Sequence, residues 1–266
     1  MYLINIYLEK MRKSNQQRLV FALLLPTIIM VFTGLLLLLV RLNRDYWGLP
    51  IATSMLLGNF ILIYILNLSY DELGLKYEKD HLPLHVIGFL LILAYSFVTI
   101  YITGIKSFNS LTKEVWYTVL FFIIAAFSDE IYFRGIIYRL LEVWDDKTAF
   151  IGSSFIYGLW TIPVGALPLT LALLTLPLPF QLGPIERIVI GLALGVLRYT
   201  SKMILLIIPL HIIFYIQNDL IVNNNVPAYL IIFSYMLLLV VIGLIIYIQI
   251  EFSKRMDKPP THLENE

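Results

Sequence analysis

Long apolar runs dominate the chain, and short polar segments separate them. The runs lie at about 19–40, 50–68, 84–102, 115–144, 149–167, 185–197, 203–216 and 228–250. Several approach 20 residues, the length that an α-helix needs to cross the hydrocarbon core of a bilayer. They are continuous, whereas the strands of a membrane β-barrel alternate between apolar and polar positions. The pattern predicts an all-α, polytopic membrane protein of about eight transmembrane helices.

Two stretches depart from a plain spanning helix. The run 115–144 would be about 45 Å long as one helix, against a hydrocarbon core of about 30 Å. We therefore expect it to tilt, to bend at Gly135 or to emerge into water near Arg139. The stretch 168–184 is apolar but contains four prolines, which predicts a kinked or re-entrant segment.

Polar and small residues within the runs predict contacts between helices. Asn59 and Asn67 are expected to hydrogen-bond to neighbouring helices. Gly191 and Gly195 have the GxxxG spacing, and residues 152–154 are also small. Such residues let two helix backbones approach closely, so we expect close packing at both places.

Composition and charge narrow the class of protein further. Hydrophobic residues make up 59% of the chain and charged residues 14%, with a mean hydropathy of +0.84. The formal net charge is only +1 and no basic stripe is present, so nucleic acid is not an expected partner. The absence of cysteine excludes disulfides, thiolate catalysis and any Cys-ligated metal site.

The distribution of cations predicts the orientation of the helices. Eight spans put both termini on one side of the membrane, and that side holds thirteen of the nineteen Lys and Arg residues. Five lie on the opposite side, among them Arg187 near the start of the run 185–197, and Arg134 lies within a span. By the positive-inside rule, we expect a multi-pass protein of the cell membrane with both termini cytoplasmic.

Three charged residues interrupt the apolar run 115–144. A charged side chain at the centre of a bilayer costs roughly 2.5 to 3.5 kcal/mol by insertion scales, so Asp129, Glu130 and Arg134 are functional candidates. Glu130 and Arg134 stand four residues apart and are expected to pair on one helix face. Asp129 is turned about 100° from Glu130 and must meet other neighbours. The pair alone is consistent with a structural lock, whereas a buried carboxylate at Asp129 suits the activation of water.

A histidine on a later span lies at a similar predicted depth. Counted from the nearest cytoplasmic cations, His211, Glu130 and Thr161 lie roughly 13 to 21 Å into the membrane. These three side chains are therefore expected to line one cavity. The alternative for His211 is a neutral ring that hydrogen-bonds to a backbone carbonyl.

The string SDEIYFRG at residues 128–135 resembles the first motif, EExxxR, of the CAAX protease and bacteriocin-processing (CPBP, Abi) family of intramembrane endopeptidases. The family's later motifs, FxxxH and HxxxN, correspond here to YGLWT at 157–161 and HIIFY at 211–215. The matches by identity are Glu130, Arg134 and His211. Three positions differ, so the chain resembles a divergent member: Asp129, Thr161 and Tyr215 replace the family's Glu, His and Asn.

The resemblance implies a fold and a set of site residues. The helices would enclose a central cavity open to the cytoplasm, and the resemblance divides the chain into helices 1 to 3 (1–112), a catalytic core (113–220) and a last helix with its tail (221–266). The catalytic residues would be Asp129, Glu130, Arg134 and His211, with water activated by a carboxylate and the oxyanion steadied by the histidine.

Three residues are candidates to substitute for the missing family side chains. The hydroxyls of Thr161 and Tyr215 can each donate a hydrogen bond, and Asn218 lies two turns from His211 on the same helix face. The departures matter because a base displaced by about 1 Å can cost a hundredfold in rate, and a lost oxyanion donor roughly 10² to 10³.

The resemblance implies an intramembrane endopeptidase that acts on a prenylated or membrane-associated protein or peptide. Two alternatives remain open: a catalytically silent relative that binds a membrane peptide or partner protein, and a proton-coupled transporter, although no inverted repeat is visible. No cofactor is expected, and a metal is not supported, because one intramembrane His cannot supply an ordinary zinc site.

Overall fold

A computed structural model describes residues 15–40, 48–76, 82–103, 115–165, 183–205, 207–221 and 228–256. The regular structure in these ranges is helical throughout, which confirms the all-α prediction for this part of the chain. The helices are α2 (Asn15–Leu39), α3 (Gly48–Leu66), α4 (Leu82–Thr103), α5 (Val115–Asp129), the π-helix η4 (Glu130–Ile137), α6 (Tyr138–Glu142), α7 (Asp146–Gly165), α10 (Gly183–Ser201), α11 (Ile207–Ile221) and α12 (Ala228–Met256).

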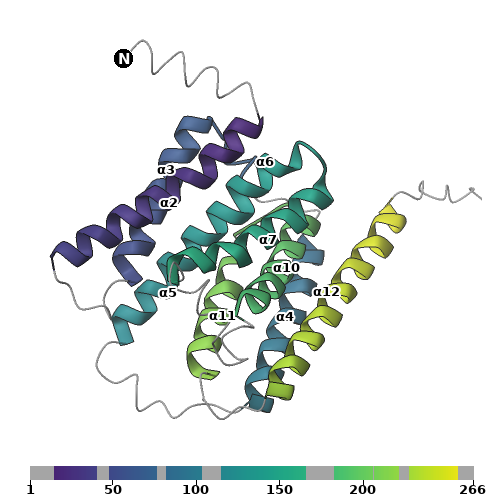
Figure 1. The fold of residues 1–266 in the computed structure, drawn as a ribbon. Helices are drawn as coiled ribbons and strands as arrows, with labels where there is room; N and C mark the ends of the chain where they lie inside the picture. The colour runs from purple at the N-terminus through teal and green to yellow at the C-terminus, as the bar shows by residue number, and fades with distance from the viewer. Residues whose placement is uncertain are drawn as a thin grey trace, which may run out of the picture.

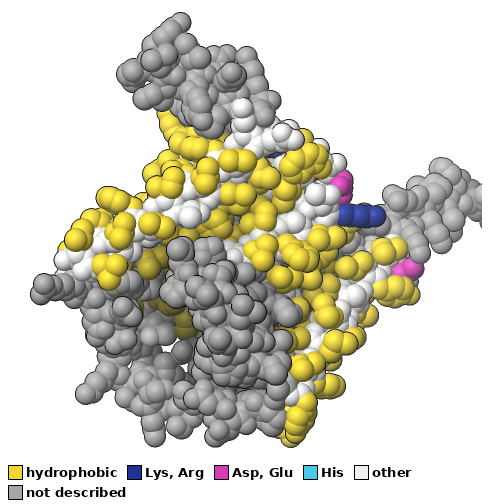
Figure 2. Space-filling model, viewed as in Figure 1, with side chains coloured by type: hydrophobic (Ala, Val, Ile, Leu, Met, Phe, Trp, Pro, Cys, Tyr) yellow, Lys and Arg dark blue, Asp and Glu magenta, His cyan; other side chains and the backbone are white. Residues whose placement is uncertain are grey.

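Four of the described helices are long and apolar enough to cross a membrane. They are α2, α3, the segment Leu82–Ile102 of α4 and the segment Ile232–Glu251 of α12, while the apolar segment Ile207–Ile216 of α11 is shorter. Hydrophobic side chains cover much of the outer surface of the described helices, as Figure 2 shows for one face. Such a surface suits lipid and not water, so the protein is an integral membrane protein. Neither the count of eight spans nor the central cavity is established by these helices.

Residues 115–142 of the central run form one continuous rod of α5, η4 and α6, which crosses the middle of the molecule (Figure 1). Helices α2 and α3 pack on one side of this rod, and α3 contacts α5 directly. On the other side lie α7, α10 and α11, with α4 and α12 beyond them. The rod therefore carries the motif 128–135 into the interior of the bundle.

Helices α7 and α10 approach closely because both carry small residues at their contact. A Cβ added to Gly191 would lie 2.9 Å from the backbone oxygen of Ser154, and one on Gly195 would lie 2.8 Å from the Ser154 hydroxyl. Gly158 of α7 would likewise meet the backbone of Ile188 at 2.9 Å. The close packing predicted from the GxxxG spacing is thus confirmed.

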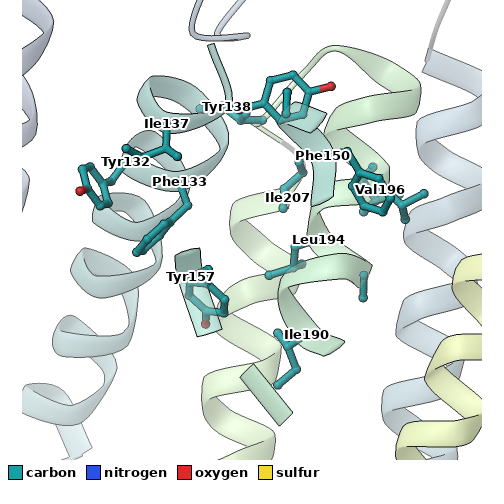
Figure 3. Close-up of a cluster of buried hydrophobic side chains, with 14 of the residues drawn as sticks. Tyr132, Phe133, Ile137, Tyr138, Phe150, Tyr157, Ile190, Leu194, Val196 and Ile207 are labelled. Atoms are coloured by element: carbon teal, nitrogen blue, oxygen red, sulfur yellow. The ribbon is translucent and has the colours of Figure 1, made fainter. Parts of the chain in front are cut away.

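Aromatic side chains fill the core between the rod and this helix pair. Figure 3 shows Tyr132 and Phe133 of η4 near Tyr157 of α7, with Leu194 of α10 beside them. The rings of Phe133 and Tyr157 meet edge to face, with centroids 5.1 Å apart. The Tyr132 hydroxyl, which would otherwise be buried without a partner, donates to the backbone oxygen of Ala22 at 2.9 Å.

The two asparagines of the second run have different environments. Asn59 is buried and its amide donates to the backbone oxygen of Ser128 at 2.8 Å, as predicted. The prediction for Asn67 was wrong, because this exposed residue follows the end of α3 with φ of 52°. Asparagine tolerates this left-handed conformation at a helix C-terminus better than most residues do. The predicted re-entrant stretch 168–184 lies almost entirely outside the described residues.

A cluster of ion pairs joins three polar segments at one end of the bundle. Arg139 of α6 contacts Glu72 of the α3–α4 loop at 3.1 Å and Glu142 at 2.9 Å. Lys202, after α10, contacts Glu142 at 3.5 Å and Asp146 at 2.8 Å. The charge count had assigned these segments to the same side of the membrane, and the contacts are consistent with that grouping. Helix α2 begins and α12 ends toward this end of the bundle (Figure 1).

Glu72 is held in this cluster by more than its ion pair. Its carboxylate accepts hydrogen bonds from the backbone N–H and the hydroxyl of Ser69, at 2.8 and 3.0 Å. These bonds, together with Arg139, hold the pKa of Glu72 below its ordinary value, with the backbone bond from Ser69 as the largest cause.

Candidate active site

The predicted motif lies where the central rod changes from α-helix to π-helix. Asp129 is the last residue of α5, and Glu130 through Arg134 belong to η4. At the end of this segment the backbone N–H of Tyr138 donates to the oxygen of Phe133, five residues earlier, as in a π-helix. In an α-helix the acceptor would be the oxygen of Arg134, four residues earlier. The Arg134 oxygen instead accepts from Nε of Arg198 in α10, at 3.2 Å. Helix α10 thus supports the backbone that presents the motif.

Glu130 and Arg134 form the ion pair predicted from their spacing. Arg134 Nη1 lies 3.2 Å from Glu130 Oε1, and both side chains are fully buried. Arg134 Nη2 also donates to the backbone oxygen of Gly191 at 3.2 Å, and the guanidinium carbon lies 4.5 Å from the ring centroid of Tyr157. A buried charge is tolerable when it is paired in this way, so the pair ties the rod to α7 and α10.

His211 of α11 connects Glu130 to α7. Its Nδ1 lies 2.5 Å from Glu130 Oε1, and its Nε2 lies 2.9 Å from the hydroxyl of Tyr157. An ionised carboxylate only accepts hydrogen bonds, so Nδ1 of a neutral His211 carries the proton and Nε2 accepts from Tyr157. Both ring nitrogens therefore have partners. The alternative of a ring bonded to a backbone carbonyl is not what the structure contains.

Asp129 faces a different partner from Glu130, as expected from its rotation about the helix axis. The Tyr215 hydroxyl donates to Asp129 Oδ2 at 2.5 Å. The ring of Tyr215 is held by stacking on His211, with centroids 4.7 Å apart, and on Phe122, at 5.6 Å. The Asp129 side chain is 15% exposed, against 0% for Glu130. Asp129 is therefore the carboxylate at the accessible edge of the site.

The structure brings five of the seven predicted site residues together. Asp129, Glu130 and Arg134 of the rod meet His211 and Tyr215 of α11 through the contacts above. The other two, Thr161 in α7 and Asn218 in α11, have side chains outside the described part of the structure. Their predicted roles remain predictions.

Two residues of the site were not predicted from the sequence. Tyr157 of α7 is buried and bonds to His211, and Arg187 of α10 donates from Nη1 to the Tyr157 hydroxyl at 3.3 Å. The Arg187 guanidinium carbon also lies 5.6 Å from the ring centroid of Tyr215. Tyr157 stands at the Phe position of FxxxH, so its extra hydroxyl was a signal that a buried partner is present. The sequence offered no comparable signal for Arg187.

The side chains that meet here do not fit a metal ion. Within the described ranges, no group of three or more His, Cys, Asp and Glu side chains is arranged to hold one. Both nitrogens of His211 are engaged in hydrogen bonds, so no imidazole lone pair faces an open position. The donor set suits a network of hydrogen bonds around two carboxylates.

A comparison with protein-family models matches residues 111–216 to the family described as Type II CAAX prenyl endopeptidase Rce1-like. This segment includes all three motif positions on which the resemblance was based, and the resemblance is confirmed for it. Comparisons with curated proteins and with solved structures gave no match.

Proposed function

We propose that the protein is an intramembrane endopeptidase of the CAAX-processing type, which hydrolyses a peptide bond in a prenylated or membrane-associated protein or peptide. The observation that carries the proposal is that two adjacent carboxylates each contact a side chain at another motif position. Asp129 is bonded to Tyr215, and Glu130 is bonded to Arg134 and His211. The family match at residues 111–216 supports the reaction type.

In this proposal Asp129 is the general base. It is the more exposed of the two acids, and among the described residues hydrogen bonds engage its Oδ2 and leave Oδ1 open. A water bonded to Oδ1 would give up a proton to Asp129 while its oxygen attacks the peptide carbonyl carbon. The proton would then pass to the leaving amine as the C–N bond breaks, which returns Asp129 to its ionised form.

The pairing of Asp129 with Tyr215 answers the concern that aspartate is one methylene shorter than the family's glutamate. A tyrosine reaches farther than the family's asparagine, and here its hydroxyl meets the shortened carboxylate at 2.5 Å. The stacked rings of His211 and Phe122 fix the position of Tyr215. Both departures therefore belong to one contact, which positions the base instead of leaving it loose.

Glu130, Arg134 and His211 have a positioning role in this proposal. Glu130 holds the protonated Nδ1 of His211, and Arg134 balances the charge of Glu130. These side chains are 0 to 1% exposed, so their contacts with one another keep the rod, α7, α10 and α11 in register beneath the accessible edge. We further propose that the core comprises residues 113–220, between segments 1–112 and 221–266, and that both termini are cytoplasmic.

A second candidate function is a catalytically silent relative that binds a membrane peptide or a partner protein. The specific observation in its favour is that Glu130 pairs with both Arg134 and His211 and that all three side chains are buried. Such a network is also what a purely structural remnant would retain.

The two functions are separated by an assay on the purified full chain in lipid nanodiscs. The chain is offered two peptide libraries, one farnesylated near the C-terminus and one of unmodified membrane-spanning peptides, and products are identified by mass spectrometry. We expect cleavage that Asp129→Asn abolishes and that Asp145→Asn, on an exposed loop, leaves unchanged. Cleavage that persists in both Asp129→Ala and Glu130→Ala would exclude the proposed mechanism. No cleavage by the wild type, or by a variant with Glu, His and Asn restored at 129, 161 and 215, would favour the silent relative.

A further inference from the structure

Two of the side chains expected to steady the oxyanion, those of His211 and Tyr215, already bind other groups. Tyr215 stands at the position of the family's Asn, but its hydroxyl donates to Asp129. His211 directs Nδ1 to Glu130, and its Nε2 faces the Tyr157 hydroxyl. Neither group has a spare donor in this arrangement. A tetrahedral intermediate at Asp129 would need positive charge or N–H groups from another residue.

Among the described residues of the site, Arg187 is the cation that remains. It is partly exposed, and its guanidinium lies close to Tyr157 and over the ring of Tyr215. Among the described residues no carboxylate lies within ion-pair distance of Arg187. Its partners are instead a neutral hydroxyl and an aromatic face. A guanidinium carries five N–H donors, and the contact with Tyr157 engages Nη1.

The charges of the site also favour this residue. Arg134 is neutralised by Glu130 and is fully buried, so it has no access to a substrate. Arg187 and Asp129 flank Tyr215 from its ring face and from its hydroxyl, respectively. When water at Asp129 attacks a peptide carbonyl, the carbonyl oxygen would therefore lie near the Arg187 guanidinium. A guanidinium stabilises the negative charge on that oxygen more strongly in a site that excludes water.

We propose that Arg187 is a catalytic residue that binds the oxyanion formed from the peptide carbonyl, in the role that the family assigns to its last His and Asn. This inference rests on the proposed endopeptidase function. Tyr157 is the matching positioning residue, because its hydroxyl accepts from Arg187 and donates to His211.

The first test uses kinetics of whichever peptide the library assay identifies. Arg187→Met should lower kcat by about 10² to 10³ and leave KM nearly unchanged, the range measured for loss of one oxyanion donor. Arg187→Lys keeps the charge and should recover part of kcat. Arg139→Met removes an arginine that contacts Glu72 and Glu142 and none of the site residues, and it serves as the matched control. If Arg187→Met cleaves at the wild-type rate, or raises KM alone, the assignment is wrong although the endopeptidase function stands.

The second test does not depend on turnover. Hexadecylphosphonate carries a tetrahedral anion on a lipid chain, and hexadecanamide is its neutral counterpart. In nanodiscs, the phosphonate should raise the thermal midpoint of the wild type and of Arg187→Lys more than the amide does, and this preference should vanish in Arg187→Met. If the wild type prefers the phosphonate and Arg187→Met does not, but the chain cleaves no peptide, the anion site at Arg187 stands and the endopeptidase function is rejected. A preference equal in wild type and Arg187→Met would overturn the inference.

Discussion

The hydroxyl of Tyr215 donates a hydrogen bond of 2.5 Å to the carboxylate of Asp129, and both residues stand at positions where the chain departs from the family pattern. One side chain is shorter than the family residue and the other is longer. The contact indicates that the two departures compensate for each other. Their effects on mutation should therefore be coupled.

A double-mutant cycle tests this coupling. Tyr215→Asn removes the donor that Asp129 requires, and Asp129→Glu moves the carboxylate into the space that Tyr215 occupies, so each single change should destabilise the protein. The double variant restores both family residues, and we expect its loss to be smaller than the sum by about 0.5 to 3 kcal/mol. Free energies of unfolding from detergent titration provide the measurement. Additive losses would show that the two positions are independent.

The buried pair of Glu130 and Arg134 should be costly to break from one side. Glu130→Gln still accepts the hydrogen bond from His211 but leaves Arg134 as an unbalanced buried charge, so we expect a loss of about 3 to 5 kcal/mol. The double variant Glu130→Gln/Arg134→Met removes both charges and should lose less than the sum of the two single variants. The same detergent titration measures both. A loss below about 1 kcal/mol for Glu130→Gln would contradict the geometry described here.

The close contact of α7 and α10 should not tolerate a side chain at Gly191. A Cβ there would lie 2.9 Å from the backbone oxygen of Ser154, so Gly191→Ala should destabilise by about 1 to 3 kcal/mol. The Gly191 oxygen also holds Arg134, so activity should fall with stability. Gly34 in α2 is the matched control, because nothing lies within 4 Å of its added Cβ. Gly34→Ala should stabilise by about 0.5 to 1 kcal/mol, the usual gain within a helix.

Glu72 predicts a specific dependence of stability on pH. Its pKa in the folded protein is below the ordinary value of 4.5, so its contribution is fully present above about pH 5. The contribution is lost as the pH falls through the lowered pKa, when the carboxyl is protonated. The thermal midpoint of the wild type should therefore exceed that of Glu72→Gln at pH 6, and the difference should shrink on acidification. Because the side chain is 35% exposed, we expect the difference to be small. A difference independent of pH would contradict this account.

The sequence was most informative about contacts that depend on which face of one helix a residue occupies. The spacing of Glu130 and Arg134 predicted their ion pair, and the rotation of Asp129 predicted that it meets other neighbours. The approach of α7 and α10 followed from the small residues Gly191 and Gly195. Each of these features depends on local helix geometry and on burial, which the order of residues determines directly.

The parts that the sequence did not predict depend on how separate helices are arranged. Arg187 was counted only among the cations on the side opposite the termini, yet its helix brings it to the hydroxyl of Tyr157, thirty positions earlier in the chain. The second motif drew attention to its last position, Thr161, whereas Tyr157 at its first position makes the contact with His211. A pattern of residue types cannot give such distances, because they depend on the packing of α7, α10 and α11.

The π-helical segment η4 has a further consequence for the motif. A π-helix closes its hydrogen bonds over five residues instead of four, so its side chains leave the axis in directions that an α-helix of the same sequence would not reproduce. Deleting one residue between Glu130 and Ile137 would turn everything after it by about 100°, including Arg139 with its ion pairs to Glu72 and Glu142. Transplanting the motif onto an ordinary helix would likewise copy its residues and lose their directions. The directions of the motif side chains therefore depend on the π-helical backbone as well as on the residue types. Insertions or deletions within this segment should be selected against.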